Sequence, residues 1–459
     1  MAGIFGVYSY DNQNVVNITH IGLRALQTRG QESAGITVGG ENSIRTYKGE
    51  GHVINVFNEN ILKILDNPSN FSSIGHVRKF DVINKNIIEP VEIESDSFKI
   101  SIVMDGKFFD QDKFKEYDVN PNESTKLLGK IFLKHLTETG KTDKAAEKTM
   151  RELDKGYFSV AILVNGGKRT RLVVIRDPRA VKPFCIGRIG KTYIVSSESV
   201  ALNSLNAELL RDVKPGELIE FNQEDTEPQF KQLLEPKPKH CIFEYIYYAS
   251  RASIMEGKGV DEFRKEIGRK IYEFYKNSIK NKGKVIPSRD SGVGVALGFT
   301  QASGFEYDEA MIKNPYSKRT FIIPDKRIRE FETSLKFIIV KSAVKDQIIF
   351  IAEDSIVRGT VSKENTLSSK KAGAKEIHYI VSAPPLIATC PDYLYEGPKS
   401  FIASNYIGKN VQEIGECVAK EIGADSVMYP TIDMVVKAIG LPRENLCLAC
   451  FTGEYPFEV

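Results

Sequence analysis

The residues best suited to chemistry lie in Gln347–Thr360, which reads QIIFIAEDSIVRGT. An apolar run predicts a strand that ends at two adjacent carboxylates, Glu353 and Asp354. The turn that follows carries hydroxyl, guanidinium and glycine groups: Ser355, Arg358, Gly359 and Thr360. A Mg²⁺ ion or a ribose diol would offset the repulsion between the carboxylates, and a turn that opens a helix offers N–H groups to a phosphate. A solvated acidic turn at a helix N-terminus is the alternative interpretation.

Strands and helices alternate around this site, in the second half of the chain. The expected strands are Val285–Pro287, Thr320–Ile323, Gln347–Ala352 and Ile377–Ala383, and the expected helices are Gly259–Asn281 and Lys363–Ala372. That order predicts a parallel sheet of βαβ units. Ligands of such sheets bind at the carboxyl ends of the strands, where the paired acids stand.

The first half has a different pattern, with many short β segments and few helices. The expected strands include Gly3–Tyr8, Gly35–Val38, Lys99–Met104, Gly156–Val164, Thr170–Ile175 and Tyr193–Ser197, and the expected helices are Ile18–Thr28 and Thr125–Leu136. This pattern predicts stacked sheets with helices outside. The segment Glu227–His240 is rich in Pro and Lys, so it is either a linker or an exposed loop within one domain.

Composition excludes several classes of protein. The 63 basic and 60 acidic residues leave a formal charge of +3, which gives no general reason to expect nucleic-acid or membrane binding. No apolar run approaches the roughly 20 residues that span a bilayer, and the N-terminal residues do not resemble a signal peptide. We therefore expect a cytoplasmic protein whose six cysteines are free or metal-bound rather than paired as disulfides.

The motifs resemble those of the type I phosphoribosyltransferases, and of one family closely over nearly the whole chain: amidophosphoribosyltransferase, or glutamine phosphoribosyl pyrophosphate amidotransferase. The matching segments include GIFGVY (3–8), ALQTRGQESAGI (25–36), HCIFEYIYYASRAS (240–253), PSRDSG (287–292), KNPYSKRTFI (313–322), AEDSIVRGT (352–360) and CLACFTGEYP (447–456).

This resemblance implies two domains and a reaction. Residues 1–226 are expected to form an α+β N-terminal-nucleophile-hydrolase-like αββα sandwich. Residues 227–241 are expected to be a linker, and residues 242–459 an α/β type I phosphoribosyltransferase domain with a C-terminal cluster-binding tail. In the family, ammonia displaces pyrophosphate from phosphoribosyl pyrophosphate bound with Mg²⁺, which gives 5-phosphoribosylamine for de novo purine biosynthesis.

The resemblance also assigns roles in the second domain. Ser291, Glu353 and Asp354 would hold Mg²⁺ or the ribose diol, and Ser355–Thr360 would bind the 5′-phosphate. The segment that closes over the pyrophosphate would contribute Lys313, Tyr316 and Arg319. The chain departs from the family in having Glu353 for an aspartate, Arg289 for a small apolar residue, and KFII at Lys336–Ile339 for Lys-Leu-Asn-Pro.

Four cysteines form a candidate metal site. Cys447 and Cys450 form a C-x-x-C motif, and Cys241 and Cys390 stand where cluster-bearing members of the family have cysteines. Four thiolates suit either a [4Fe–4S] cluster or Zn²⁺, and spacing alone does not choose between them. The resemblance favours a structural [4Fe–4S] cluster.

The first domain lacks the residues of a glutaminase. The family's nucleophile is a cysteine exposed by removal of Met1, and this chain has Ala2 there. Asp105 replaces the asparagine of an oxyanion hole, where a carboxylate would repel the developing negative charge. Lys79–Asp81 replaces Tyr-Ser-Thr, and an aspartate expected near Asn122–Thr125 is missing. Glutamine hydrolysis is therefore predicted to be absent.

Arg29 and Arg78 persist from the family pattern, and each is predicted either to bind a ligand or to be structural. Two functions remain open for the chain. It is either an enzyme that uses free ammonia or ammonia from a separate glutaminase, or a non-catalytic paralogue that binds and regulates an active amidophosphoribosyltransferase. Transfer to a different amine is a third option. The family pattern suggests a homo-oligomer.

Overall fold

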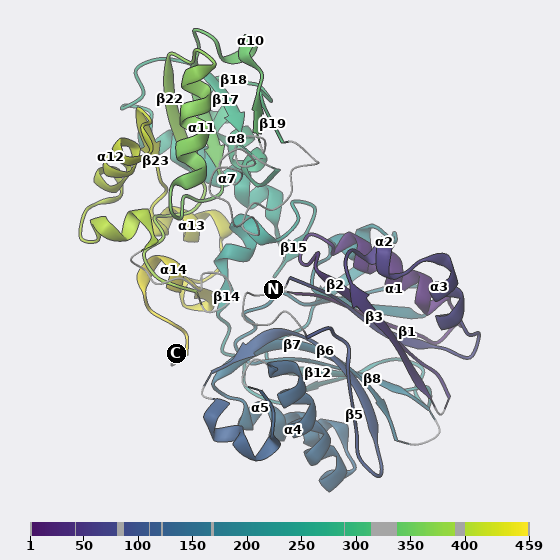
Figure 1. Ribbon diagram of the computed structural model, residues 1–459. Coiled ribbons are helices and arrows are strands. Elements are labelled where there is room, and N and C mark those ends of the chain that lie inside the picture. The colour runs from purple at the N-terminus through teal and green to yellow at the C-terminus, as the bar shows by residue number, and fades with distance from the viewer. Residues whose placement is uncertain are drawn as a thin grey trace.

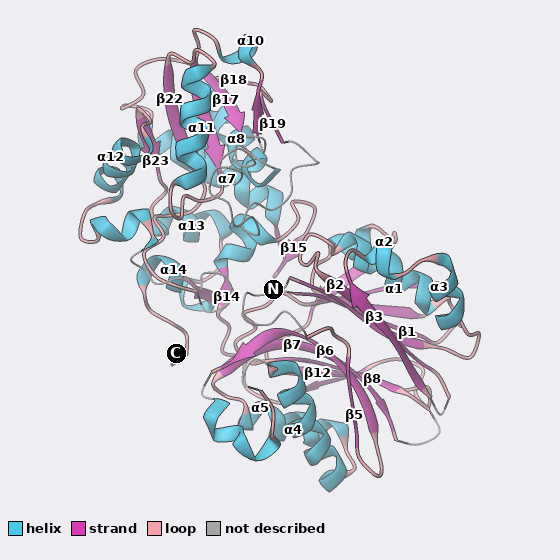
Figure 2. Cartoon of the chain, viewed as in Figure 1, coloured by secondary structure: helices cyan, strands magenta, loops and turns pink. Residues whose placement is uncertain are grey.

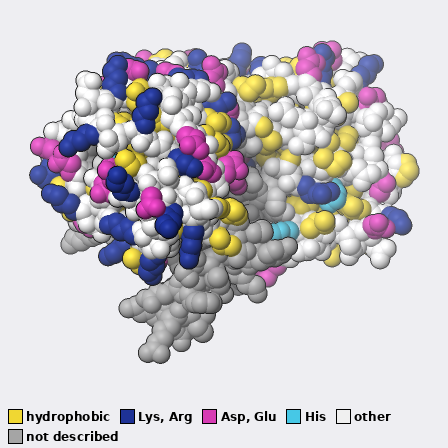
Figure 3. Space-filling model, turned by 90° about the horizontal axis from the view of Figure 1, so that it is seen from above, with side chains coloured by type: hydrophobic (Ala, Val, Ile, Leu, Met, Phe, Trp, Pro, Cys, Tyr) yellow, Lys and Arg dark blue, Asp and Glu magenta, His cyan; other side chains and the backbone are white. Residues whose placement is uncertain are grey.

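The computed structural model describes residues 2–41, 43–79, 87–109, 111–120, 123–166, 169–288, 290–313, 337–390 and 400–457. The chain folds into a β-rich first domain (β1 to β13) and a second domain (from β14 onward) built around a smaller sheet (Figure 1). Among the described helices, none combines the length and the hydropathy needed to cross a membrane. Basic and acidic side chains are interspersed on the face drawn in Figure 3.

The first domain contains two antiparallel sheets. The seven-stranded sheet has the order β11-β9-β10-β1-β4-β2-β3. Its strands are Ala2–Ser9 (β1), Ser33–Gly39 (β2), Ile44–Glu50 (β3), Ser72–Arg78 (β4), Cys185–Ile189 (β9), Thr192–Ser196 (β10) and Glu208–Asp212 (β11). The six-stranded sheet has the order β13-β12-β8-β7-β6-β5. Its strands are Val91–Glu94 (β5), Lys99–Phe108 (β6), Gly156–Asn165 (β7), Arg171–Arg176 (β8), Glu217–Phe221 (β12) and Gln229–Gln232 (β13).

The two sheets pack face to face, and helices cover their outer faces (Figure 2). The core between the sheets includes Ile4 and Ile74 from one sheet and Val103 and Leu163 from the other. The helices are Val15–Ala25 (α1), Val53–Val56 (α2), Glu59–Leu65 (α3), Ser124–Thr139 (α4), Thr142–Glu152 (α5) and Val200–Asn203 (α6). Helices α1 to α3 and α6 pack on the seven-stranded sheet, and α4 and α5 pack on the other. This is the predicted αββα sandwich.

The second domain contains a five-stranded parallel sheet of order β18-β17-β21-β22-β23. Its strands are Lys284–Pro287 (β17), Glu306–Tyr307 (β18), Ile348–Glu353 (β21), Glu376–Val381 (β22) and Ser426–Met428 (β23). The helices are Val260–Tyr275 (α7), Val293–Ser303 (α8), Lys341–Val344 (α10), Thr360–Lys371 (α11), Val411–Ile422 (α12), Ile432–Ile439 (α13) and Ala449–Thr452 (α14).

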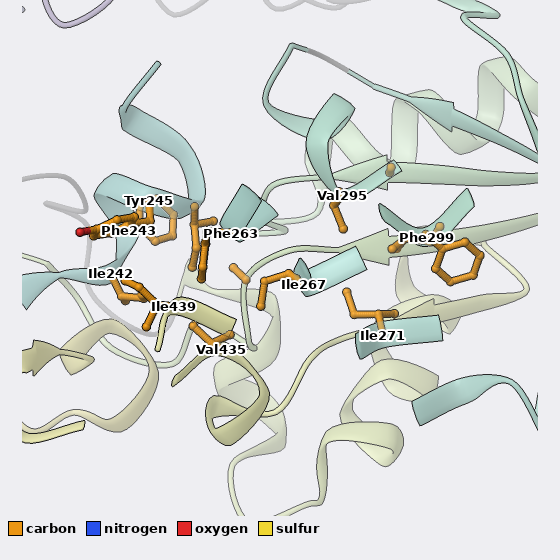
Figure 4. Packing of buried hydrophobic residues seen from close by; sticks show 14 of the residues in the cluster. Ile242, Phe243, Tyr245, Phe263, Ile267, Ile271, Val295, Phe299, Val435 and Ile439 are labelled. Atoms are coloured by element: carbon orange, nitrogen blue, oxygen red, sulfur yellow. The ribbon is translucent and has the colours of Figure 1, made fainter. Parts of the chain in front are cut away.

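Residues of the parallel strands face two cores in alternation, because helices cover both faces of the sheet. Phe350 of β21 faces the core that α7, α8 and α13 cover, and Figure 4 shows part of this core, with Phe263 of α7, Phe299 of α8 and Val435 of α13 among its members. Ile351, the next residue of the strand, faces the core that α12 covers. The α/β fold of the second domain is thus as predicted.

Short elements complete the second domain. Paired short strands are His240–Cys241 (β14) with Leu446–Cys447 (β24), Ile254–Met255 (β15) with Lys258–Gly259 (β16), and Met311–Lys313 (β19) with Phe337–Ile339 (β20). A π-helical turn, η2, spans Glu244–Tyr248, and 3-10 turns span Asp290–Gly292 (η3) and Ile402–Tyr406 (η6).

Two expectations about elements are corrected here. Gln229–Gln232, inside the segment expected to be a linker, is the edge strand β13, whose largely exposed residues lack the apolar alternation that marks a strand. Helix α7 ends at Tyr275, not near Asn281. The strand expected at Thr320–Ile323 lies outside the described residues.

Candidate active site

The paired acids stand at the carboxyl end of the central strand of the parallel sheet. β21 ends at Glu353, and its neighbour β17 ends at Pro287, which pairs with Ala352. The residues that follow β17 form the turn η3, which contains Ser291. Because parallel strands end at one edge of a sheet, this topology places Ser291 beside the acids.

Asp354 lies between two hydroxyl donors. The Ser291 Oγ donates a hydrogen bond of 2.7 Å to its Oδ1, and the Ser355 Oγ donates one of 2.7 Å to its Oδ2. Asp354 is 8% exposed. The oxygen atoms of a carboxylate and two hydroxyls are suitable ligands for a hard cation, and the carboxylate can also accept hydrogen bonds from sugar hydroxyls.

Glu353 faces the opposite way, toward helix α11. Its carboxylate accepts hydrogen bonds from the Ser362 Oγ at 2.8 Å and the Asn365 Nδ2 at 3.1 Å. The two acids therefore have separate donors, which lowers the repulsion between them. The extra methylene of Glu353, compared with aspartate, lengthens its reach toward α11.

The predicted phosphate turn connects β21 to α11 and includes Ser355, Arg358 and Gly359. Gly359 has φ +74°, and a Cβ there would lie 2.8 Å from the Cδ1 of Ile402. Glycine is required at this position for its backbone conformation and for the close approach of η6. Helix α11 begins at Thr360, so its first N–H groups point toward the turn.

Part of the predicted site lies outside the described residues. These positions are Arg289, Tyr316 and Arg319, together with the side chain of Lys313. The backbone of Lys313 is described, and it pairs with Phe337 across β19 and β20. Strand β20 is formed by Phe337–Ile339 of the stretch that departs from the family pattern.

The four predicted cluster cysteines come together. Parallel pairing of β14 with β24 places Cys241 opposite Cys447. The carbonyl of Cys450 accepts hydrogen bonds from the N–H groups of Ile387 and Ala388, which draws the segment leading to Cys390 toward it. Burial raises the pKa of the Cys241 and Cys450 thiols, and the other thiols of the group raise it further. Within the described ranges, no three His, Cys, Asp or Glu side chains are arranged to hold a metal ion.

A buried group of charges surrounds Arg29, which contacts Ala2, the position where the resemblance leads us to expect a nucleophilic cysteine. Ala2 begins β1 at the junction of the two domains (Figure 1), and its carbonyl accepts a hydrogen bond of 2.8 Å from the Arg29 Nε. The guanidinium, which is fully buried, also contacts three carboxylates: Asp105 at 3.1 Å, Glu198 at 2.8 Å and Glu244 at 2.9 Å. Burial opposes the charged form, but these carboxylates raise the pKa of Arg29 well above its ordinary value.

Asp105 is held as an anion in this group. Burial raises its pKa, but Lys182, whose Nζ lies 3.6 Å away, and Arg29 outweigh burial and lower it to about 2. A fixed anion therefore occupies the position at which the family resemblance implies a neutral oxyanion donor.

Arg78 is also paired internally. Its Nη1 donates to Glu89 at 2.9 Å, and Glu89 accepts further hydrogen bonds from the Thr125 hydroxyl at 2.7 Å and the Met104 N–H at 2.9 Å. Both arginines that persist from the family pattern thus have structural partners. Sequence analysis missed the partners Lys182, Glu89, Glu198 and Glu244, since they come from separate segments with no recurrent spacing.

Comparisons with known proteins agree with this architecture. No family model matches the chain. The amidophosphoribosyltransferase of Methanocaldococcus jannaschii is 36% identical over all of this chain and 98% of its own length. That of Pyrococcus horikoshii is 37% identical over 99% of this chain and 96% of its own.

A solved structure covers both domains as well. The glutamine phosphoribosylpyrophosphate amidotransferase of Bacillus subtilis, in complex with ADP and GMP, superimposes with a TM-score of 0.86 at 28% identity. The match covers 99% of this chain and 97% of that one. The chain therefore belongs to the amidophosphoribosyltransferase family.

Proposed function

We propose that this protein transfers the phosphoribosyl group of phosphoribosyl pyrophosphate to ammonia, forming 5-phosphoribosylamine for purine biosynthesis, and does not hydrolyse glutamine. The proposal is carried by one observation: Asp354 accepts hydrogen bonds from Ser291 and Ser355 where the proposed phosphate-binding turn begins. It rests also on membership of the family.

The residues present fit Mg²⁺. Asp354 would hold it, with the Ser291 hydroxyl 2.7 Å from its carboxylate, since both offer oxygen atoms. Glu353, the third residue expected to hold the ion, directs its carboxylate toward α11. When bound, Mg²⁺ neutralises charge on the leaving pyrophosphate.

The chain's own residues supply binding and positioning. The turn Ser355–Thr360 would hold the 5′-phosphate with its N–H groups and hydroxyls, at the N-terminus of α11. Asp354 would accept hydrogen bonds from the ribose hydroxyls and stabilise positive charge that develops on the ring. Lys313, Tyr316 and Arg319 would contact the pyrophosphate.

Two features support the absence of glutamine hydrolysis. Ala2 has no nucleophilic atom, and Asp105 holds a negative charge against Arg29, which also binds the Ala2 carbonyl. Arg29 and Arg78, which could have bound a substrate carboxylate, are engaged by buried glutamates. Ammonia would therefore arrive free or from a separate glutaminase.

A structural [4Fe–4S] cluster is proposed at Cys241, Cys390, Cys447 and Cys450. A single Zn²⁺ needs its thiolates within about 4 Å of one another, because each Zn–S bond is about 2.3 Å long. In a four-iron cluster each thiolate binds a different iron, so the thiolates stand farther apart. The proposal is supported by the gathering of the four thiols at the pairing of β14 with β24 and by the family resemblance.

One assay tests the reaction. Purified protein receives phosphoribosyl pyrophosphate and Mg²⁺ with either ammonium or glutamine, and pyrophosphate release is measured. Release with ammonium alone is the expected result. Binding of phosphoribosyl pyrophosphate without release would overturn the proposal in favour of a regulatory paralogue.

A further inference from the structure

The buried group of charges around Arg29 in the first domain includes a residue of the second domain, Glu244. The guanidinium of Arg29 donates from Nη1 and Nη2 to the two oxygens of Glu244, each at 2.9 Å. Glu244 opens the turn η2 of the second domain and is 1% exposed. Paired, parallel hydrogen bonds fix orientation as well as distance. The first domain thus fixes the orientation of the Glu244 side chain.

Further contacts hold the residues that follow η2. Glu198 of the first domain accepts hydrogen bonds from the Ser250 N–H at 2.8 Å and the Ser253 hydroxyl at 2.7 Å. The hydroxyl of Ser199 accepts one from the Ile254 N–H at 2.7 Å. Arg29, Glu198 and Ser199 of the first domain therefore bind the segment 244–254 at several points along its length.

The same segment binds Arg264 of α7 on its other side. The Nε of Arg264 donates to the Tyr245 carbonyl at 2.8 Å, and its Nη2 donates to the Ala249 carbonyl at 2.9 Å. Arg264 is 2% exposed. Burial lowers its pKa to about 10, and Asp354 contributes the largest opposing charge.

Helix α7 in turn supports the residues around Ser291. A Cβ at Gly294, in the first turn of α8, would lie 2.6 Å from the Cβ of Arg264, and one at Gly298 would lie 1.8 Å from the Lys265 carbonyl. The two helices are in direct contact, and α8 begins immediately after Ser291 and Gly292. A shift of α7 would therefore move the hydroxyl that binds Asp354.

We infer that Glu244 is a positioning residue for the transferase site, through which the buried charges around Arg29 hold η2, Arg264 and Ser291 in place. This inference rests on the proposed function for its effect on substrate, but not for its effect on the fold.

The test compares Glu244→Gln with Glu89→Gln in the full chain. Both changes replace a buried carboxylate by an amide of equal size, but the hydrogen bonds and ion pairs of Glu89 are with first-domain residues. The Glu244→Gln variant should fold, because Arg29 still forms its ion pairs with Asp105 and Glu198. Two quantities are measured: backbone hydrogen exchange over 242–254 and 290–298, and the Kd for phosphoribosyl pyrophosphate with Mg²⁺.

Glu244→Gln is expected to speed exchange in both segments and to raise that Kd at least ~5-fold, whereas Glu89→Gln leaves both at the wild-type values. Unchanged exchange over 290–298 in Glu244→Gln, or equal effects of the two variants, would overturn the inference. If wild-type protein does not bind phosphoribosyl pyrophosphate, the proposed function fails. In that case, the comparison of hydrogen exchange between the two variants still tests whether Glu244 positions the residues around Ser291.

Discussion

The hydroxyl of Ser291 and the carboxylate of Asp354 are joined by a hydrogen bond of 2.7 Å, although 63 residues separate them in the chain. Two neighbouring parallel strands, β17 and β21, bring them to the same edge of the sheet. This pair defines the proposed metal and ribose site.

Replacing Asp354 by Asn should abolish transferase activity, because the variant loses the charge that would bind Mg²⁺ and stabilise the ribose ring. The expected loss in kcat/KM is about 100-fold or more, with a smaller loss for Ser291→Ala. Steady-state kinetics with ammonium measures both. Asp346→Asn is the control, since Asp346 is exposed and precedes the opposite end of β21. Wild-type activity in Asp354→Asn would exclude this site.

Introducing cysteine at the first position should not restore glutaminase activity. In Ala2→Cys the thiol would stand near Asp105, whose pKa is about 2, so the site keeps a negative charge where the oxyanion must form. A missing oxyanion donor alone costs about 10²–10³-fold in rate. Glutamate release from glutamine is the measurement, on protein whose Met1 has been removed. Efficient release by the single variant would contradict the role given to Asp105, and Ala2→Cys with Asp105→Asn provides the comparison.

Asp105 should stabilise the fold at neutral pH and lose that effect in acid. Its pKa falls from 3.8 in the unfolded chain to about 2, since Lys182 and Arg29 outweigh burial. Because its pKa is lower in the folded state, ionised Asp105 stabilises the folded protein above about pH 4. This contribution to the free energy of unfolding disappears as the pH falls from about 4 toward 2.

Asp105→Asn should therefore lower the free energy of unfolding by about 2 kcal/mol at pH 7. The difference from wild type should shrink below pH 4. Denaturant unfolding at pH 7, 5, 4 and 3 measures this difference. A difference that stays constant across the series would mean that the ionised carboxylate is not what stabilises the fold.

Removal of cluster thiols should release iron. After anaerobic reconstitution, wild-type protein is expected to hold iron and acid-labile sulfide in equal amounts, and Cys241→Ser and Cys450→Ser should lose both. Cys417→Ser should retain them, because Cys417 lies on α12, outside the group. The assay is chemical analysis with visible absorbance. Stoichiometric zinc without sulfide would show that the site binds a single ion instead.

Local sequence patterns predicted stacked sheets with outer helices in the first domain, a parallel βαβ sheet in the second, and the strand and turn of the candidate site. Short apolar runs sufficed for strands such as β1 and β21, and Gly359 marked a turn whose backbone conformation favours glycine. Strand β13 was missed because its residues are largely exposed at a sheet edge.

The buried charges could not be predicted in the same way. Arg29, Lys182 and Glu244 meet only through tertiary packing across two domains, so no spacing in the sequence reveals them. Each would look like an ordinary surface residue by composition. The structural role of Arg29 became apparent only from its carboxylate partners.

The most direct measurement follows the product of the proposed reaction. Phosphoribosylamine, trapped as it forms, is quantified with phosphoribosyl pyrophosphate and Mg²⁺ in the presence of either ammonium or glutamine. The account predicts formation with ammonium that rises with pH, as free ammonia increases, and none with glutamine. Formation with glutamine at a comparable rate, in protein free of any other glutaminase, would contradict it.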